Sequence, residues 1–375
     1  MELLDVERST LERYMPGLDG QLVQTPLMQL EAPDGHAIKL FRESGGSGLL
    51  IQSEHQGLGA SALDAVRVQR AIGSRSPSLA IASTMHHFSV ATLVEFAAHT
   101  GGIEWMLLQA IAQQKLLVAS GFAEGSTGAG ILSAGMAATQ VTGGYTVSGV
   151  KRPCSLTYSM DLLTASVMLP RESGDGEELA VLLIPAATKG IERAKFWGNT
   201  VLAGAESDQV TLTDVMVPDR LVFRAGGAEN LDPIQVAGFL WFELLITASY
   251  LGVATALVER AIKGKRGDAV DRARLGIEVE GAMAALEGVA RTMMEDRRGD
   301  AELAQMLFVR YLTQGVIERA TTLAAELLGG IAFVSSSEVG YLYAASRALA
   351  FHPPGRTSMS EALTNFLAGG SLSIG

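Results

Sequence analysis

The stretch Thr139-Gln-Val-Thr-Gly143-Gly144-Tyr-Thr-Val147 marks the point where the hydrophobic pattern of the chain changes. It is rich in β-branched and aromatic residues and carries a glycine pair, which is typical of strands joined by a tight turn. Similar runs follow at Leu162–Met168, Leu179–Ile184 and Gln209–Val217. The sequence therefore predicts a small all-β unit of about a hundred residues.

Residues on both sides of this unit follow a helical pattern. Before it, Ser61–Ile72 and Ser89–Ala112 carry apolar residues three and four positions apart, with the turn-like Gly73–Pro77 between them. After Pro218 the pattern predicts four more helices, each ended by glycine or by a break in the period. They are expected over residues 233–264, 268–298, 300–328 and 338–350.

This order of segments predicts an α+β fold with three domains. We expect a helical N-terminal domain over 1–117, a middle β-domain over 118–225 and a C-terminal four-helix bundle domain over 226–375. The chain shows no tandem repeat and no long linker, so the domains should pack closely on one another.

Composition excludes several classes of function. The 375 residues include 29 Lys and Arg against 40 Asp and Glu, a formal net charge of −11, and they contain no basic run that could track a nucleic acid backbone. The single cysteine, Cys154, is compatible with a reducing compartment, and the acidic start does not resemble a signal peptide. We therefore expect a cytoplasmic protein with no nucleic acid partner.

Val236–Val258 is long and apolar enough to be mistaken for a membrane span. The only charged residue between Asp232 and Glu259 is Glu243, but Gly, Ala, Ser and Thr are frequent in the run. A helix buried on all sides of a large protein produces the same pattern. We expect such a buried helix and no membrane partner.

Five short motifs lie in a fixed order along nearly the whole chain. They are Gly48-Leu-Leu-Ile with Gln56-Gly-Leu-Gly, Phe122-Ala-Glu-Gly-Ser-Thr-Gly, Gly144-Tyr-Thr-Val-Ser-Gly-Val-Lys, Thr213-Asp-Val-Met-Val-Pro and Leu327-Leu-Gly-Gly. Together they resemble the acyl-CoA dehydrogenase family of flavoproteins. The resemblance implies the three-domain fold, FAD as cofactor, and α,β-dehydrogenation of an acyl thioester by proton abstraction and hydride transfer to flavin N5.

Glu243 is the residue expected to act as the catalytic base. It lies in the apolar run Leu240–Ile246, where burial raises the pKa of a carboxyl group, as a base working near neutrality requires. The resemblance places it at the base position of isovaleryl-type and long-chain members, whereas the commoner base position falls on Arg356. The alternative is a buried carboxylate held by a neighbouring Arg or by backbone donors, since buried acids are usually paired.

The resemblance also implies a set of flavin and substrate contacts. Phe122, Ala123 and Glu124 would line the pyrimidine edge of the flavin, Ser155 would face N5, and Glu326, Gly329 and Gly330 would lie near the adenine half of FAD. The backbone N–H of Thr357 would bind the thioester carbonyl. On its residues alone, Ser155 is better explained as an ordinary loop serine at a strand start. The glycine pair is also typical of a helix C-cap, and the two interpretations are compatible.

Departures from the family pattern concern the FAD phosphates and the substrate handle. The Arg-x-x-Phe-Gly segment that binds the phosphates is missing, with Arg266-Gly-Asp in its neighbourhood. Several polar groups near the thioester end are also lost. The acyl group is therefore expected on CoA or on an acyl carrier protein, and electrons would leave to an electron-transfer flavoprotein or to O2.

Further expectations concern assembly and metals. A helical C-terminal domain that shares FAD between chains implies a homo-oligomer, either a dimer or a tetramer. Adjacent His86 and His87 point in different directions on a helix, and no Cys or Asp cluster completes a ligand set, so we expect no metal.

Two other functions remain open at this point. The first is a flavin-dependent monooxygenase on the same fold, which needs no carboxylate base. The second is a redox-silent scaffold that keeps the fold but has lost FAD, which the altered phosphate-binding segment makes worth testing.

Overall fold

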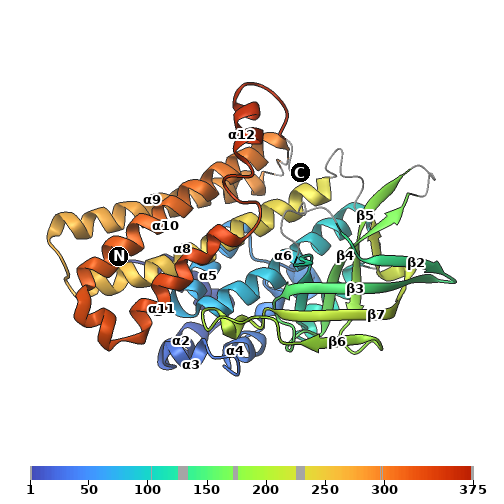
Figure 1. Cartoon of the computed structure of the whole chain (residues 1–375), viewed down its shortest axis with the longest axis horizontal. Coiled ribbons are helices and arrows are strands. Elements are labelled where there is room, and N and C mark those ends of the chain that lie inside the picture. Colours follow the sequence, from blue (N-terminus) through green and yellow to red (C-terminus); the bar gives the residue numbers. More distant parts are fainter. Residues whose placement is uncertain are drawn as a thin grey trace.

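The computed structural model describes residues 2–102, 104–125, 134–171, 176–224, 233–295, 297 and 299–372. The helices from both ends of the chain lie together, and the strands from its middle lie to one side of them (Figure 1). The predicted α+β class is confirmed. Residues 225–232, at the expected junction of the β-domain and the C-terminal domain, and Ser126–Gly128 of the second motif lie outside the described residues.

The first part of the chain is helical. Its helices are α1 (Asp5–Tyr14), α2 (Leu18–Gln24), α3 (Leu27–Leu30), α4 (Ala37–Glu43), α5 (Ala62–Arg75), α6 (Pro77–Thr100) and α7 (Glu104–Gln113), with 3-10 turns η1 (Gly46–Gly48) and η2 (Ser53–His55). The sequence prediction was wrong about the start of α6, which begins at Pro77 and not at Ser89. The Ser76 hydroxyl accepts a hydrogen bond from the Leu79 N–H, and proline at the first helical position lacks only an N–H that a helix does not need.

The middle part forms two four-stranded sheets, ordered β1-β4-β5-β8 and β2-β3-β7-β6. The strands are β1 (Val118–Gly121), β2 (Ala137–Val141), β3 (Gly144–Cys154), β4 (Leu162–Pro170), β5 (Glu177–Pro185), β6 (Ile191–Ala194), β7 (Asp208–Pro218) and β8 (Val222–Arg224), with 3-10 turns η3 (Ala203–Ala205) and η4 (Asp219–Leu221). The predicted turn joins β2 to β3. At Gly144 a Cβ would lie 2.1 Å from the Val217 carbonyl oxygen, so only glycine fits.

The last part of the chain is again helical. It comprises α8 (Pro233–Lys263), α9 (Ala269–Met294), α10 (Asp300–Ser335), α11 (Ser337–Ser346), η5 (Arg347–Phe351) and α12 (Ser360–Leu367). The expected stop at the glycine pair is a bend inside α10, where Gly329 has φ of 83°. Helix α8 is long and apolar enough to cross a membrane, but it packs against α5, α6, α9, α10 and α11 and most of its residues are buried. It is the buried helix that the sequence predicts.

Helices α6 and α8 run antiparallel and pack against one another. The hydroxyls of Thr84 and Ser249 lie 2.9 Å apart, Phe88 packs against Phe242, and a Cβ on Gly238 would come within 2.9 Å of the Thr92 hydroxyl. These contacts follow one another in opposite chain directions. Residues four apart on α6 share one face, so this face is fixed against α8 over about two turns.

Candidate functional site

Four ring side chains from four separate segments form a continuous row. Phe122 follows β1, Phe88 lies on α6, Phe242 on α8, and His352 follows η5. Successive ring centroids are 5.8 Å, 5.3 Å and 6.2 Å apart, within the range of favourable aromatic pairs. This aromatic row joins the N-terminal helices, the end of a strand and the C-terminal helices at one place.

His352, at one end of the aromatic row, is held by Tyr250 of α8. The Tyr250 hydroxyl lies 2.9 Å from Nε2 of His352, and either group can donate, depending on the tautomer. Burial, with a further contribution from the Arg310 cation, lowers the pKa of His352 to about 3. The imidazole is therefore neutral at physiological pH and has one ring nitrogen, Nδ1, beyond this hydrogen bond.

Glu243 is ion-paired with Arg310 of α10. Nη1 of Arg310 lies 2.7 Å from Oε1 and 2.6 Å from Oε2 of Glu243, and both side chains are buried. Burial raises the pKa of Glu243 to about 7, while the guanidinium acts in the opposite direction. Of the two alternatives for this carboxylate, the structure shows the one paired with an arginine.

Arg310 also binds the segment that carries His352. Its Nη2 donates to the carbonyl oxygens of Leu349, at 3.2 Å, and of His352 itself. The hydroxyl of the adjacent Tyr311 donates to the Pro354 carbonyl at 3.0 Å. The Arg310 guanidinium therefore joins α8, α10 and residues 349–353, and it fixes the backbone of His352 relative to the aromatic row.

The flavin contacts expected from the β-domain lie on neighbouring strand ends. The Arg152 N–H donates to the Ala123 carbonyl at 2.8 Å, and Glu124 forms an isolated bridge with Arg152, so the chain after β1 runs beside the end of β3. Ser155 follows β3 directly, and its hydroxyl lies 2.9 Å from that of Ser207. Phe122 is brought into the aromatic row, whereas the Glu124 carboxylate binds the Lys151 ammonium at 2.6 Å.

These residues fit a flavin ring. The rings of the aromatic row offer apolar surface, and the two buried hydroxyls of Ser155 and Ser207 share one hydrogen bond between them. Two hydroxyls carry two protons, so the pair keeps one proton for donation as well as lone pairs for acceptance. Such a pair can serve flavin N5 whether N5 accepts or donates.

The remaining predicted residues lie elsewhere. Glu326 is exposed on α10, sixteen positions after Arg310 (326 − 310), which is about 24 Å along a helix that rises about 1.5 Å per residue. Gly329 and Gly330 follow at the bend, and Thr357 is exposed after η5. Glu326 and the glycine pair therefore lie well along α10 from Arg310.

Several site residues were missed from the sequence. Arg310 is a single cation in the apolar run Met306–Leu312, and such an isolated charge is a signal for a buried partner of opposite sign. Phe88 and Phe242 had no distinguishing signal, because apolar rings on buried helices are common. Ser207 lies outside every motif considered.

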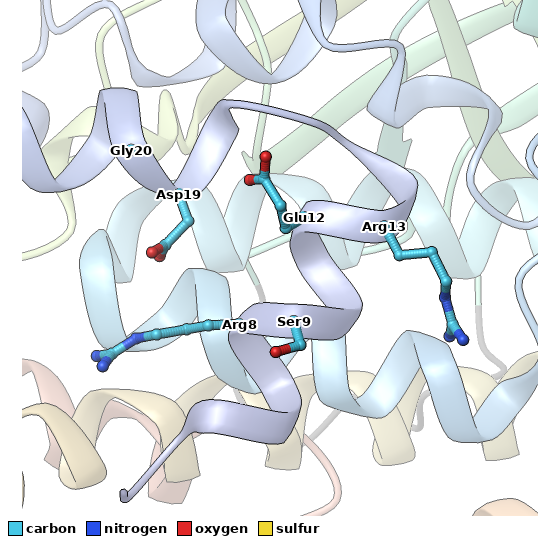
Figure 2. Close-up of a pocket in the computed structure, with 6 residues that line it drawn as sticks. All are labelled: Arg8, Ser9, Glu12, Arg13, Asp19 and Gly20. Atoms are coloured by element: carbon cyan, nitrogen blue, oxygen red, sulfur yellow. The ribbon is translucent and has the colours of Figure 1, made fainter.

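A surface hollow lies away from these residues. Shown in Figure 2, it is lined by Arg8, Ser9, Glu12, Arg13, Asp19 and Gly20 of α1 and α2, and its two arginines point away from one another. Arg8 is bound to Glu259 at 2.7 and 2.8 Å, and Arg13 to Asp64. Its cations are thus already neutralised by the protein, so we do not take this hollow as the site.

Comparison with known proteins gives one relative in sequence and many in structure, although no family model matches. Isobutylamine N-hydroxylase from Streptomyces viridifaciens is 46% identical over 381 residues and covers the whole of both chains. KijD3 in complex with dTDP has a TM-score of 0.83 at 18% identity, with 97% of each chain covered. FMN-bound TdsC from Paenibacillus sp. A11-2, a dibenzothiophene monooxygenase, has a TM-score of 0.79 at 20% identity, covering 99% and 98%.

These similarities correct the expected reaction. A relative identical at almost half of all positions is an amine N-hydroxylase, so the prediction that the chain dehydrogenates an acyl thioester was wrong. The physical reason is that this fold serves more than one chemistry, which depends on the site and not on the architecture. Dehydrogenation required Glu243 to act as the base that removes the α-proton, so this predicted role is withdrawn as well. The predicted acyl thioester substrate, on CoA or on a carrier protein, is also withdrawn.

Proposed function

The chain belongs to the family of isobutylamine N-hydroxylase, flavin oxidoreductases of the acyl-CoA dehydrogenase-like fold, and we propose that it is a flavin-dependent monooxygenase that hydroxylates the nitrogen of a small aliphatic amine. The observation that carries this proposal is the identity of 46% over the full length of both chains. The reaction balances as amine, O2, two electrons and two protons giving the hydroxylamine and water. Membership of this enzyme family also argues against the hypothesis that the chain is a redox-silent scaffold.

The flavin, when bound and reduced, activates O2 for transfer of one oxygen atom. Within this chain, we propose that the hydroxyls of Ser155 and Ser207 and the backbone of Phe122 and Ala123 hold its ring, against the aromatic row. Their role is to orient the ring and to keep water from it, since water entry would let activated oxygen escape without reaching the amine.

We propose that the cofactor is FMN and not the FAD implied by the resemblance. The TdsC structure is described as FMN-bound, and KijD3 has also been solved with FMN. The phosphate-binding segment typical of FAD is altered at Arg266-Gly-Asp. Mass spectrometry of the flavin released from purified protein, and its affinity for each flavin, test this proposal.

The electrons must come from a redox partner. Hydroxylation consumes two electrons per turnover, whereas an electron-transfer flavoprotein, which the dehydrogenase resemblance implied, would remove them. We therefore propose a flavin reductase in the cytoplasm as the partner. Turnover should begin when reduced flavin is supplied, by a reductase with NAD(P)H or by chemical reduction.

The amine must reach the site without its extra proton, because only the neutral nitrogen has a lone pair to accept oxygen. The buried Arg310 cation and the apolar rings of Phe88 and Phe242 disfavour an ammonium ion there. His352, with its low pKa, is too weak a base to deprotonate an ammonium ion, so we propose that the amine loses its extra proton to water before it binds. When Nε2 donates to the Tyr250 hydroxyl, Nδ1 keeps its lone pair and can accept a hydrogen bond from the N–H of the neutral amine. Tyr250 fixes the ring in position for this contact.

Glu243 has a supporting role in this proposal. Its carboxylate binds Arg310, and Arg310 binds the backbone of Leu349 and His352. We therefore treat Glu243 and Arg310 as positioning residues that act through His352. Ser155, Phe122 and His352 are the groups expected to meet flavin or substrate.

We further propose that the chain forms a homo-oligomer through its C-terminal helices. Ile331 and Val334, beyond the bend in α10, and Phe351 of η5 are each more than 80% exposed, which is unusual for large apolar side chains. A second copy of the chain that covers these side chains would also bring its Glu326 and glycine pair near another protomer. Light scattering on Ile331→Lys and Val334→Lys variants, which should dissociate the oligomer, tests this proposal.

The proposed reaction is tested by supplying the purified protein with reduced FMN, O2 and a panel of aliphatic amines that includes isobutylamine, and identifying products by mass spectrometry. We expect hydroxylamines. A butyryl thioester of CoA serves as the matched control substrate and should return unchanged. Absence of any hydroxylamine, with flavin bound and reduced, would reject the proposal.

A further inference from the structure

We propose that the buried ammonium of Lys151, paired with Glu124, is a positioning residue for flavin binding: the pair fixes the path of the chain directly after β1. This inference rests on the proposed flavin-dependent function. In this inference Glu124 does not contact the flavin directly. It instead fixes the position of Phe122 and Ala123, which are proposed to contact it.

The Lys151 side chain is held on all sides. It extends from β3, is fully buried, and its Nζ donates to Glu124 Oε1 at 2.6 Å, to the Ser166 carbonyl at 2.9 Å and to the Ser166 hydroxyl at 3.1 Å. An ammonium group has three protons to donate, and all three have acceptors here. Burial lowers the pKa of Lys151, and the Glu124 carboxylate opposes this change.

Glu124 uses both of its carboxylate oxygens. Oε1 accepts from Lys151, and Oε2 accepts from the backbone N–H of Gly135 at 2.8 Å, eleven residues further along the chain. The Glu124 carboxylate therefore links the start of the connection between β1 and β2 to Gly135 near its end. It also links both to Lys151 of β3. A third tie is the hydrogen bond from the Arg152 N–H to the Ala123 carbonyl.

The backbone next to this pair has little freedom to move. At Gly125 φ is 71°, a conformation that favours glycine, and a Cβ there would lie 2.8 Å from Nε of Arg152. At Gly121 a Cβ would lie 3.3 Å from Cγ of Lys151 and 2.9 Å from the Thr164 carbonyl oxygen. The chain from Gly121 to Gly125 is thus packed closely against the Lys151 and Arg152 side chains.

Phe122 and Ala123 lie between these two glycines. Phe122 is the member of the aromatic row that comes from the β-domain, and the backbone of both residues is proposed to meet the flavin. Loss of one member of a buried ion pair leaves the other charged and without a partner, so the chain must rearrange to solvate it. Lys151 therefore acts on the flavin through the position of Phe122 and Ala123.

A purely structural role makes a different prediction from a positioning role. If the Lys151–Glu124 pair only stabilises the fold, its removal lowers the melting temperature of the flavin-free protein but leaves flavin affinity of the folded protein unchanged. If it positions the loop, the flavin Kd rises. The pair of Arg70 with Glu7, also buried but formed between α5 and α1, provides a matched control.

The experiment measures the Kd for FMN by quenching of flavin fluorescence, with circular dichroism to confirm folding, in wild type, Lys151→Met, Glu124→Gln, the double variant and Glu7→Gln. We expect Glu124→Gln, which leaves the fully buried Lys151 ammonium without a counter-charge, to raise the Kd by about tenfold or more. Lys151→Met should raise it by less, because the remaining Glu124 carboxylate is partly exposed and still accepts from Gly135. The double variant should raise it by no more than Glu124→Gln, because the two residues act as one unit. Glu7→Gln should lower thermal stability and leave the Kd unchanged.

Each outcome separates the inference from the proposed function. If wild type binds no flavin, the proposed function itself fails. If wild type binds FMN and both folded single variants bind it as tightly, the positioning role is wrong while the function stands. Should Lys151→Met not fold, Glu124→Gln decides alone, because its amide can still accept from Gly135 while the charge is lost.

Discussion

Nη1 of Arg310 lies within 2.7 Å of both carboxylate oxygens of Glu243, although the two residues are 67 positions apart in the chain. The pair is buried between α8 and α10, and the same guanidinium reaches the backbone of Leu349 and His352. An acid that the sequence suggests as a base is therefore half of a neutral pair that anchors the segment after η5. This arrangement suits a site in which an oxygen atom is transferred and no carbon acid is deprotonated by a carboxylate.

Removal of the negative charge of this pair should destabilise the protein strongly. At pH 8, above the pKa of about 7 that Glu243 has in the folded protein, its carboxylate is ionised. Glu243→Gln then leaves Arg310 charged and buried, and breaking a buried pair in this way costs about 3–5 kcal/mol. Urea unfolding measures the loss. Glu278→Gln is the matched control, because its partner Arg319 is half exposed, and such a pair contributes about 0–1 kcal/mol. Equal stability of the two variants would contradict the account.

His352 should make folding stability depend on pH in a defined direction. Its pKa of about 3 in the folded protein lies below the ordinary value of 6.5, so between these pH values the unfolded chain binds more protons and stability rises with pH. Glu243, with its pKa raised to about 7, acts in the opposite direction between about pH 4.5 and 7. His352→Asn keeps Glu243, so the variant isolates the imidazole contribution.

The measurement is the urea midpoint at pH 4.5 and 6.5 in wild type and His352→Asn. Between pH 4.5 and 6.5 the histidine contribution raises the urea midpoint of wild type. We therefore expect the midpoint of His352→Asn to rise less, or to fall more, over this range than that of wild type. An identical pH response in both proteins would show that the imidazole is not buried in its neutral form.

Tyr250→Phe should leave the fold intact and reduce hydroxylation. The variant removes one hydrogen bond, between the hydroxyl and Nε2 of His352, at a buried position. The loss of orientation is expected to lower kcat roughly tenfold, equal to about 1.4 kcal/mol of transition-state stabilisation. The rate of hydroxylamine formation at saturating amine, measured by mass spectrometry, tests this. An unchanged kcat would remove Tyr250 from the proposed site.

Replacing a ring of the aromatic row with a smaller side chain should let water reach the proposed flavin site. In Phe88→Leu, we expect more of the consumed O2 to be recovered as hydrogen peroxide and less as hydroxylamine. Phe96→Leu, on the same helix but packed edge-on against Phe223 of β8, is the matched control. The aromatic row has no special role if both variants release the same amount of peroxide.

The fold could be predicted because its signals are local. The alternation around Gly143–Gly144, the stop at Gly264 and the apolar run of α8 each depend on residues close in sequence, and the structure confirms each. The stop expected at Gly329–Gly330 is instead a bend inside α10. The start of α6 was misplaced because Pro77 was interpreted as a breaker, although at the first helical position it favours the helix.

The site could be predicted only in part, since its contacts are long-range. Phe122 and Ser155 lie on strand ends that local motifs identify, but the partner of Glu243 comes from another helix and the partner of Ser155 is Ser207, 52 residues away. A carboxylate in an apolar run has the same sequence pattern whether it is a base or an ion-pair partner. Its environment, which decides between them, requires the packed structure.

The most direct test of the central claim uses isotopically heavy O2. The purified protein is supplied with reduced FMN, isobutylamine and labelled O2, and the product is analysed by mass spectrometry. We predict a hydroxylamine that carries one labelled oxygen atom on nitrogen. Unlabelled product, or conversion of an acyl thioester control to its α,β-unsaturated form without oxygen incorporation, would contradict the account.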